Sequence, residues 1–170
     1  NIHIGVYGKN WNLASNSFHF LSLFSFLNNN KKIYVDNHKL TKPIKSKRKN
    51  FYETRGFISI KTDNGDTLNL HDDKNSLNFE HIIIKNDANI FIISEIKRII
   101  YTININKGLI NARPFNYLLQ SQMTQKFFKL DNKNLDNLNI NFRYKNDITL
   151  LNFFKKIFEK KIKNNNIPIT

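Results

Sequence analysis

The residues that could carry out acid–base, nucleophilic or metal chemistry are few in this chain, and their spacing forms no catalytic set. Cysteine is absent, which excludes disulfides, thiolate metal sites and cysteine nucleophiles. The histidines show no close pairing of the kind that zinc sites use; they lie at positions 3, 19, 38, 71 and 81. Asp63-Asn64-Gly65-Asp66 lacks the ligand spacing of a calcium loop, and the adjacent Asp72 and Asp73 indicate a turn.

Motifs for nucleotide chemistry and hydrolysis are also missing from the sequence. There is no Gly-x-x-x-x-Gly-Lys loop, no Gly-x-Gly-x-x-Gly fingerprint, no serine elbow and no His-Glu-x-x-His. We therefore expect no catalytic residue, no metal, no cofactor and no small-molecule substrate, so that the protein is not an enzyme.

Basic side chains are the one concentrated chemical feature. The segment 36–50 contains no acid beyond Asp36, and the whole chain of 170 residues carries a net charge of +14. Lysine and arginine bind phosphate groups and release counterions, so this excess favours a polyanionic partner; the alternative for the segment is a solvated loop. The candidate RNA-binding residues are Lys9, Lys39, Lys42, Lys45, Lys47, Arg48, Lys49 and Arg55.

The elements that must position these side chains follow from the hydrophobic pattern. Alternating or isoleucine-rich runs predict strands over 2–7, 32–35, 52–60, 67–70, 80–85, 89–93, 98–105 and 138–144. Helices are predicted from a cap at Ser15 or Asn16 to Leu27, from Pro114 to Phe128, and over 149–162, with a short strand at 167–169. The longest apolar runs are far too short to span a membrane, and no membrane partner is expected.

Several short motifs occur in an order that resembles one family. Ile2-x-Ile4-x-Val6, Asn10-x-x-Leu13, Leu40-Thr41-Lys42-Pro43 and Tyr52-Glu53-Thr54-Arg55 follow one another as in the small-subunit ribosomal protein family S-ten. The chain departs from the family at Arg55-Gly56-Phe57, where the family has Arg-Thr-His. The resemblance implies an α+β fold, a ferredoxin-like βαββαβ plait with a four-stranded antiparallel sheet and two helices on one face.

The same resemblance implies a domain organisation and a function. Residues 1–60 and 147–170 would form the plait core with a basic hairpin at 36–50, and residues 61–146 a strand-rich, lineage-specific insert. The protein would be a structural constituent of the head of the small ribosomal subunit. Its partners would be ribosomal RNA and neighbouring ribosomal proteins.

Composition also bears on where the gene lies. Asn, Lys, Ile and Phe, which A/T-only codons encode, are abundant. This pattern indicates a very AT-rich genome, such as the mitochondrial DNA of some protists, an apicoplast or a reduced endosymbiont. The predicted location is mitochondrial, with an organelle-encoded gene as one option. The alternatives are an accessory subunit of another organellar assembly, such as a respiratory complex, and a free RNA- or DNA-binding factor.

Overall fold

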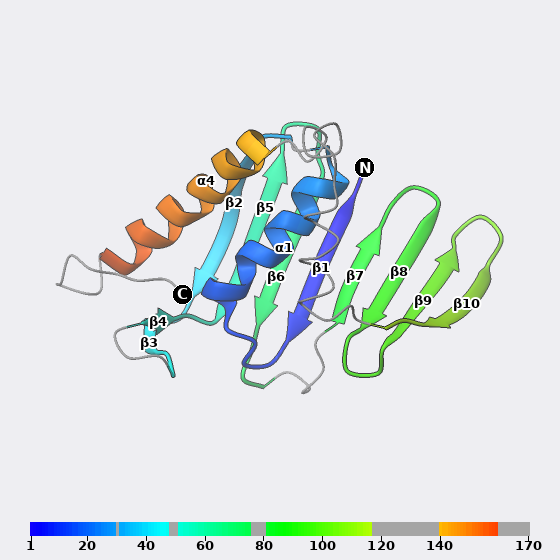
Figure 1. Cartoon of the computed structure of the whole chain (residues 1–170), viewed down its shortest axis with the longest axis horizontal. Coiled ribbons are helices and arrows are strands. Elements are labelled where there is room, and N and C mark those ends of the chain that lie inside the picture. The colour runs from blue at the N-terminus through cyan, green and yellow to red at the C-terminus, as the bar shows by residue number, and fades with distance from the viewer. Residues whose placement is uncertain (30, 48–50, 76–80, 117–139, 160–170) are drawn as a thin grey trace, which may run out of the picture.

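One mixed sheet organises the protein. The structure is a computed structural model that describes residues 1–29, 31–47, 51–75, 81–116 and 140–159. Eight strands form the sheet in the order β10-β9-β8-β7-β1-β6-β5-β2, and β3 with β4 forms a separate two-stranded hairpin (Figure 1). The strands are β1 His3–Gly8, β2 Ile33–Leu40, β3 Ile44–Lys45, β4 Tyr52–Glu53, β5 Gly56–Thr62, β6 Thr67–Asp72, β7 His81–Lys85, β8 Asn89–Ser94, β9 Ile99–Asn104 and β10 Leu109–Pro114. The described helices are α1 Leu13–Leu27 and α4 Ile140–Glu159.

β1 lies inside the sheet and pairs on both sides. It runs parallel to β6, with Val6 opposite Leu70, and antiparallel to β7, with Val6 opposite Ile82. β5 joins β6 to β2 through antiparallel pairing on both of its edges. Because β1 and β6 are parallel, their carboxyl ends meet at one edge of the sheet, where loops can gather side chains into a site.

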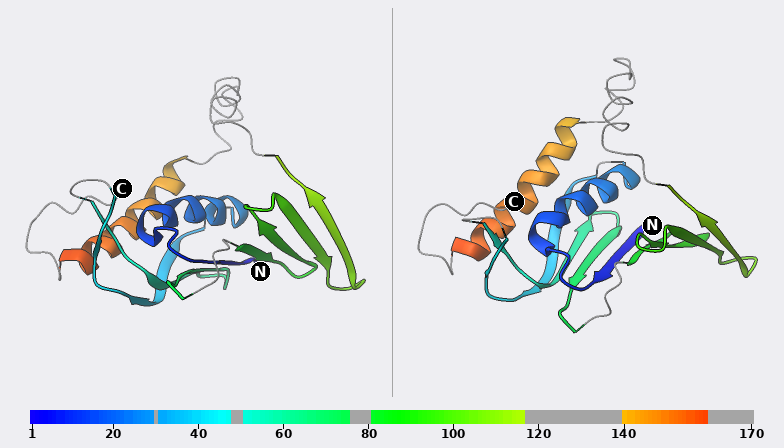
Figure 2. Two further views of the ribbon diagram at one scale, coloured as in Figure 1. Left: turned by 90° about the horizontal axis from the view of Figure 1, so that it is seen from below. Right: turned by 60° about the horizontal axis from the view of Figure 1, so that its bottom comes forward.

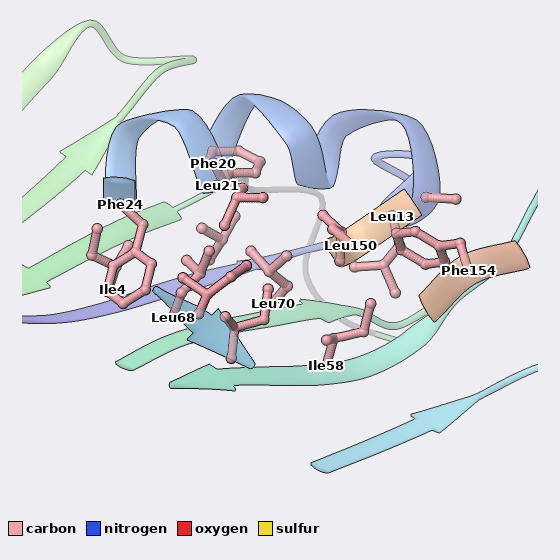
Figure 3. Close-up of a cluster of buried hydrophobic side chains, with 14 of the residues drawn as sticks. Ile4, Leu13, Phe20, Leu21, Phe24, Ile58, Leu68, Leu70, Leu150 and Phe154 are labelled. Carbon is pink, nitrogen blue, oxygen red and sulfur yellow. The ribbon is translucent and has the colours of Figure 1, made fainter. Parts of the chain in front are cut away.

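Both helices cover the same face of the sheet, over β2, β5, β6 and β1, while β8, β9 and β10 extend beyond them (Figure 2). The core between helices and sheet is apolar, because alternate residues of each strand point toward the helices. Phe24 of α1 and Phe154 of α4 are fully buried against this face, as are Ile58 and Leu70 of the sheet (Figure 3). Each fully buried side chain of this size stabilises the fold by about 1.5–3 kcal/mol.

The predicted four-stranded plait is wrong. Five strands, β6 to β10, come from the segment predicted to be an insert, and they join the same sheet as β1. β6 even separates β1 from β5. Alternation within a strand says which face is buried but not which strand is its neighbour, so the non-local pairing escaped prediction. The closing strand at 167–169 lies outside the described residues, and the division into core and insert stays a prediction.

Two further differences concern the second half of the chain. The strand predicted over 138–144 is wrong, since α4 begins at Ile140. Pro114 ends β10 instead of opening a helix, and most of the helix predicted to follow it lies outside the described residues. Neither α1 nor α4, the helices of the described part of the chain, is long and apolar enough to cross a membrane.

Asp66, in the turn between β5 and β6, ties that turn to the start of β1. Its carboxylate is 2% exposed, accepts a hydrogen bond from the Ile2 N–H at 2.9 Å and lies 3.0 Å from the Lys31 ammonium. Burial is the largest influence on the pKa of Asp66 and raises it. The Ile2 N–H and the Lys31 charge together outweigh burial and hold the pKa below its ordinary value. The ionised form therefore stabilises the fold.

We predict that Asp66→Ala lowers the free energy of unfolding by about 2–3 kcal/mol at neutral pH, because the Ile2 N–H loses its acceptor. Asp66→Asn keeps an acceptor but loses the charge. A lowered pKa gives stability that is present above the titration range of an unfolded aspartate and is lost at lower pH. The gap between parent and Asp66→Asn should therefore close as the pH falls below about 4.

Urea unfolding at neutral pH and at about pH 3 measures both effects. Asp63→Asn is the matched control, because Asp63 lies on the same turn but is exposed, and it should change stability by less than about 0.5 kcal/mol. Equal losses in the Asp63 and Asp66 variants would contradict the assigned role.

Candidate functional site

The corner between β1 and α1 lies at the carboxyl ends of β1 and β6. Asn10 and Asn12 both have left-handed backbone conformations, with φ of 57° and 62°, which asparagine tolerates better than most residues. Trp11 between them is buried, and its indole N–H donates to the His71 carbonyl oxygen at 3.0 Å. Its ring also meets Phe20 edge-on, at 5.3 Å between centroids. The corner is therefore held to both the sheet and the helix.

Glu53 of β4 supplies the N-terminal cap of α1. The Asn12 side chain makes no capping hydrogen bond. Instead the Glu53 carboxylate, from a residue 7% exposed, accepts hydrogen bonds from the Ala14 N–H at 3.0 Å and the Ser15 N–H at 3.4 Å. A carboxylate here satisfies free amides of the first turn and also suits the positive end of the helix dipole. The helix consequently starts at Leu13, before the predicted caps.

Asp72, the last residue of β6, is the second carboxylate at this corner. It is 1% exposed, and its Oδ1 accepts a hydrogen bond from the Asn10 N–H at 2.6 Å. Within the described residues its Oδ2 has no hydrogen-bond partner. Burial is the main cause that raises the pKa of Asp72, opposed by the Asn10 N–H, by the charge of Arg55 and by the N–H groups of Trp11 and Leu13. Asp72 can therefore hold a proton more readily than an ordinary aspartate.

Glycines flank Asp72 on both neighbouring strands. Gly8 of β1 and Gly56 of β5 lie opposite it in the sheet register. Gly56 has φ +121°, and a side chain there would place its Cβ 2.0 Å from the Lys39 carbonyl oxygen. Only glycine fits this position, and neither glycine places a side chain beside the Asp72 carboxyl group.

Two cavities adjoin at Arg55 and Asp72, which line both of them. The hairpin cavity has a volume of about 390 Å³ and lies between the β3–β4 hairpin and the β1–α1 corner; it is lined among others by Asn10, Asn12, Lys45, Lys47 and Glu53. The β2–β6 cavity, of about 540 Å³, is lined among others by Lys39, Phe57, His71 and Lys74. We call the two together the Arg55–Asp72 cleft.

The structure brings together only some of the predicted RNA-binding residues. Arg55 lines both cavities, Lys45 and Lys47 line the hairpin cavity, and Lys39 lines the β2–β6 cavity. Lys9 and Lys42 are exposed and line neither cavity. Arg48 and Lys49 lie outside the described residues.

Sequence reasoning missed Asp72 as a site residue. The turn predicted at Asp72 and Asp73 begins only after β6, with Asp73 accepting the Asn75 N–H, whereas Asp72 ends the strand beside β1. Glu53 entered only as part of a family motif, and its capping role was not foreseen. The usable signals were Gly8 and Gly56, glycines at strand ends that indicate close approach of backbones.

Comparisons with known proteins show similarity at the level of the fold. No family model matches the sequence, and no curated protein matches it. A dehydrogenase (MviM) from Clostridium difficile has a similar structure, with a TM-score of 0.54 at 12% identity over 94% of this chain and 54% of that one. An oxidoreductase from Erwinia carotovora atroseptica SCRI1043 gives a TM-score of 0.57 at 11% identity, over 94% of this chain and 55% of that one. The chain thus spans about half the length of these proteins.

These neighbours correct the expectations drawn from the ribosomal resemblance. The predicted membership of family S-ten is wrong, since the fold is shared with dehydrogenases and oxidoreductases over nearly the whole chain. The same finding contradicts the predicted ribosomal function and the prediction that the protein is not an enzyme. It also contradicts the predicted partners, which were ribosomal RNA and ribosomal proteins with no small-molecule substrate. The short motifs shared with that family are strand and turn patterns that also occur in unrelated folds. The organellar origin stays a prediction.

Glu53 leads to a prediction about α1. Glu53→Ala should lower the free energy of unfolding by about 1–2 kcal/mol, because first-turn amides of the helix lose their acceptor. Glu53→Gln, which keeps one acceptor oxygen, should cost less. Glu159→Gln is the control, because Glu159 is exposed on α4 and only faces Lys155 at 3.7 Å. Urea unfolding compares the three variants, and an Ala variant as stable as the parent would exclude the capping role.

For Asp72 we expect that removing the charge increases stability, whereas for Glu53 it decreases stability. Its pKa is raised in the fold, so it favours folding at low pH, and this contribution is lost as the pH rises through the raised pKa. Asp72→Asn keeps an acceptor for the Asn10 N–H without the charge, and should therefore be more stable than the parent at neutral pH. This advantage should shrink and vanish in acid. Unfolding curves across pH test it, and a variant less stable than the parent at neutral pH contradicts it.

Proposed function

We propose that this chain is the sheet domain of a dehydrogenase-type oxidoreductase, and that it holds a small polar molecule in the Arg55–Asp72 cleft. The similarity of fold over 94% of the chain to about half of each neighbour supports a role as one domain of such an enzyme. The observation that carries the proposal is the pair of adjoining cavities, of about 390 and 540 Å³, whose shared wall contains Arg55 and the buried Asp72.

A buried carboxylate oxygen without a partner is costly. Leaving such a group unsatisfied costs about 1–3 kcal/mol or more, and a structure that serves stability alone would pair it or replace it. Because the Asp72 Oδ2 atom is enclosed by protein atoms, the charged groups of the cleft wall that are open to a ligand are Arg55 and the lysines around it. Cavities of 390 and 540 Å³ fall in the range of about 300–1,000 Å³ that small-molecule sites occupy.

The start of α1 does not fit a dinucleotide cofactor. Dinucleotide sites place the pyrophosphate on free amides at a helix N-terminus after a glycine-rich turn. Here the Glu53 carboxylate already accepts hydrogen bonds from Ala14 and Ser15, and its charge would repel a phosphate. The chain also lacks the Gly-x-Gly-x-x-Gly fingerprint. In the proposed enzyme, another domain therefore binds the hydride carrier, and this chain supplies the side that faces the substrate.

The test uses Trp11, the single tryptophan, which lies between two residues of the hairpin cavity wall. The protein is titrated with a panel of small alcohols, ketones and hydroxy acids, and the fluorescence of Trp11 is followed. We expect a saturable change with at least one class. Arg55→Gln should weaken that binding by about tenfold, because Arg55 lines both cavities and hydrogen bonds to a charged group contribute about 1.5–3 kcal/mol.

Lys9→Gln is the matched control, since Lys9 is an exposed cation that lines neither cavity, and it should bind like the parent. If no member of the panel binds, or if Arg55→Gln binds as tightly as the parent, the cleft is not the substrate site and the proposal fails.

A further inference from the structure

Cationic side chains without a partner border the Arg55–Asp72 cleft. The cations that line its two cavities are Arg55, Lys39, Lys45, Lys47 and Lys74. Among the residues that the structure describes, none of these five side chains makes an ion pair or a hydrogen bond. A lysine elsewhere on the sheet does find a partner, since Lys61 lies 2.8 Å from the Asp36 carboxylate. Like charges facing one space raise its positive potential, which increases the local concentration of anions.

The acids that line the same cavities do not neutralise these cations at contact distance. The Glu53 carboxylate accepts hydrogen bonds from first-turn amides of α1. Asp73 accepts a hydrogen bond from the Asn75 N–H at 2.9 Å, in the turn after β6. Asp72 is 1% exposed, so its carboxylate lies within the wall and does not reach the cavity space. A small molecule that enters the cleft thus meets cations whose charge is available.

Arg55 differs from the four lysines in burial and position. Its side chain is half-buried where the two cavities adjoin, whereas the lysines are exposed. Its backbone is fixed, because its N–H donates to Thr41 Oγ1 at 3.1 Å and its carbonyl oxygen accepts from the Thr41 N–H at 2.9 Å. A guanidinium that has lost part of its hydration gains from a new partner, and its planar fork of N–H donors matches carboxylate and phosphate oxygens. Arg55 is therefore a positioned donor for an anionic group.

The β2–β6 cavity adds an apolar wall beside Arg55. The rings of Phe57 and His71 meet edge-on, with centroids 6.4 Å apart, and both residues line this cavity together with Leu40. Aromatic and aliphatic surfaces suit the carbon skeleton of a ligand, which an inorganic ion lacks. At about 540 Å³ the cavity also has room for more than a single ion.

We propose that the molecule held in the cleft is a small organic anion, whose carboxylate or phosphate group binds the Arg55 guanidinium while its carbon skeleton lies against Phe57 in the β2–β6 cavity. Lys45 and Lys47, exposed beside the hairpin cavity, add to the potential that draws the anion in. This inference rests on the proposed function and names the ligand class of the same site.

The test compares anions with neutral molecules of nearly the same shape. Propionate is paired with propionamide and benzoate with benzamide, and phenyl phosphate is paired with inorganic phosphate. Calorimetry measures binding to the whole chain. We expect benzoate or phenyl phosphate to bind saturably and benzamide to bind at least about tenfold more weakly, because it lacks the charge. Propionate and inorganic phosphate should also bind more weakly, because they lack the ring. Benzoate and phenyl phosphate together distinguish a carboxylate from a phosphate ligand.

Variants assign the contacts. Arg55→Gln should weaken binding of the preferred anion by about tenfold or more, and Arg55→Lys, which keeps the charge but loses the fork, should restore only part of the affinity. Lys45→Gln combined with Lys47→Gln should weaken binding by a few fold. Lys9→Gln combined with Lys42→Gln is the matched control, because it removes the same charge from exposed positions that line neither cavity, and it should change affinity by less than about twofold. Circular dichroism confirms that each variant is folded.

Other outcomes overturn the inference in distinguishable ways. If neutral alcohols or ketones bind and depend on Arg55 while the anions bind no more tightly than their amides, the ligand class is wrong and the proposed function stands. If the Lys9 and Lys42 double variant loses as much affinity as Arg55→Gln, or if Arg55→Lys binds like the parent, charge alone attracts the anion and the guanidinium does not recognise it. If inorganic phosphate binds as tightly as phenyl phosphate, the apolar wall takes no part. If neither charged nor neutral molecules bind, the proposed function and the ligand class fail together.

Discussion

The structure depends on how the chain turns from β1 into α1 without leaving backbone N–H groups unsatisfied. This turn carries two left-handed asparagines, and its amides face the protein interior, where an unpaired N–H costs about 1–3 kcal/mol. Asp72 accepts the Asn10 amide, and Glu53 accepts the first-turn amides of α1. Through these bonds, β6 and the β3–β4 hairpin are fixed to the same corner. The helix can then lie on the sheet and bury Phe24 and its neighbours.

The carboxylates of Glu53 and Asp72 differ in how well the surrounding groups compensate their charge. Glu53 meets several amides at the positive end of a helix, so its charge is well placed. Asp72 has one oxygen bound and one without a partner in the described part of the chain, and burial opposes its ionisation. An asparagine would hold the Asn10 amide equally well at lower cost. The charge at Asp72, between Gly8 and Gly56, is therefore the less well compensated of the two.

Local pattern predicted many elements but not their arrangement. Alternation located β1, β6, β7, β8 and β9 to within a few residues, and the turn at Asp63 to Asp66 was placed correctly. Pairing of β1 with β6 joins residues about sixty positions apart, and nothing in either strand specifies it. The residues 138–144 misled because their alternation fits a strand, while in α4 residues two apart point to nearly opposite sides of the helix, so over this short run the alternation is coincidental. Arg55 was singled out as an RNA-binding residue through the Tyr52-Glu53-Thr54-Arg55 motif, whereas the position of Asp72 depends on the register with Gly8 and Gly56.

Charge composition alone does not distinguish a nucleic-acid partner from a small anion. The shape of the binding surface bears on that distinction. Buried Asp66, Asp72 and Glu53 are used inside the fold, so the surface is more basic than the net charge of +14 suggests. Such a surface attracts a nucleic-acid strand and a small oxyanion alike, because both respond to the same field. A strand needs a continuous groove along its backbone, whereas cavities of 390 and 540 Å³ around one arginine admit a small molecule. The cations gathered around Arg55 thus suit a small anion better than a strand.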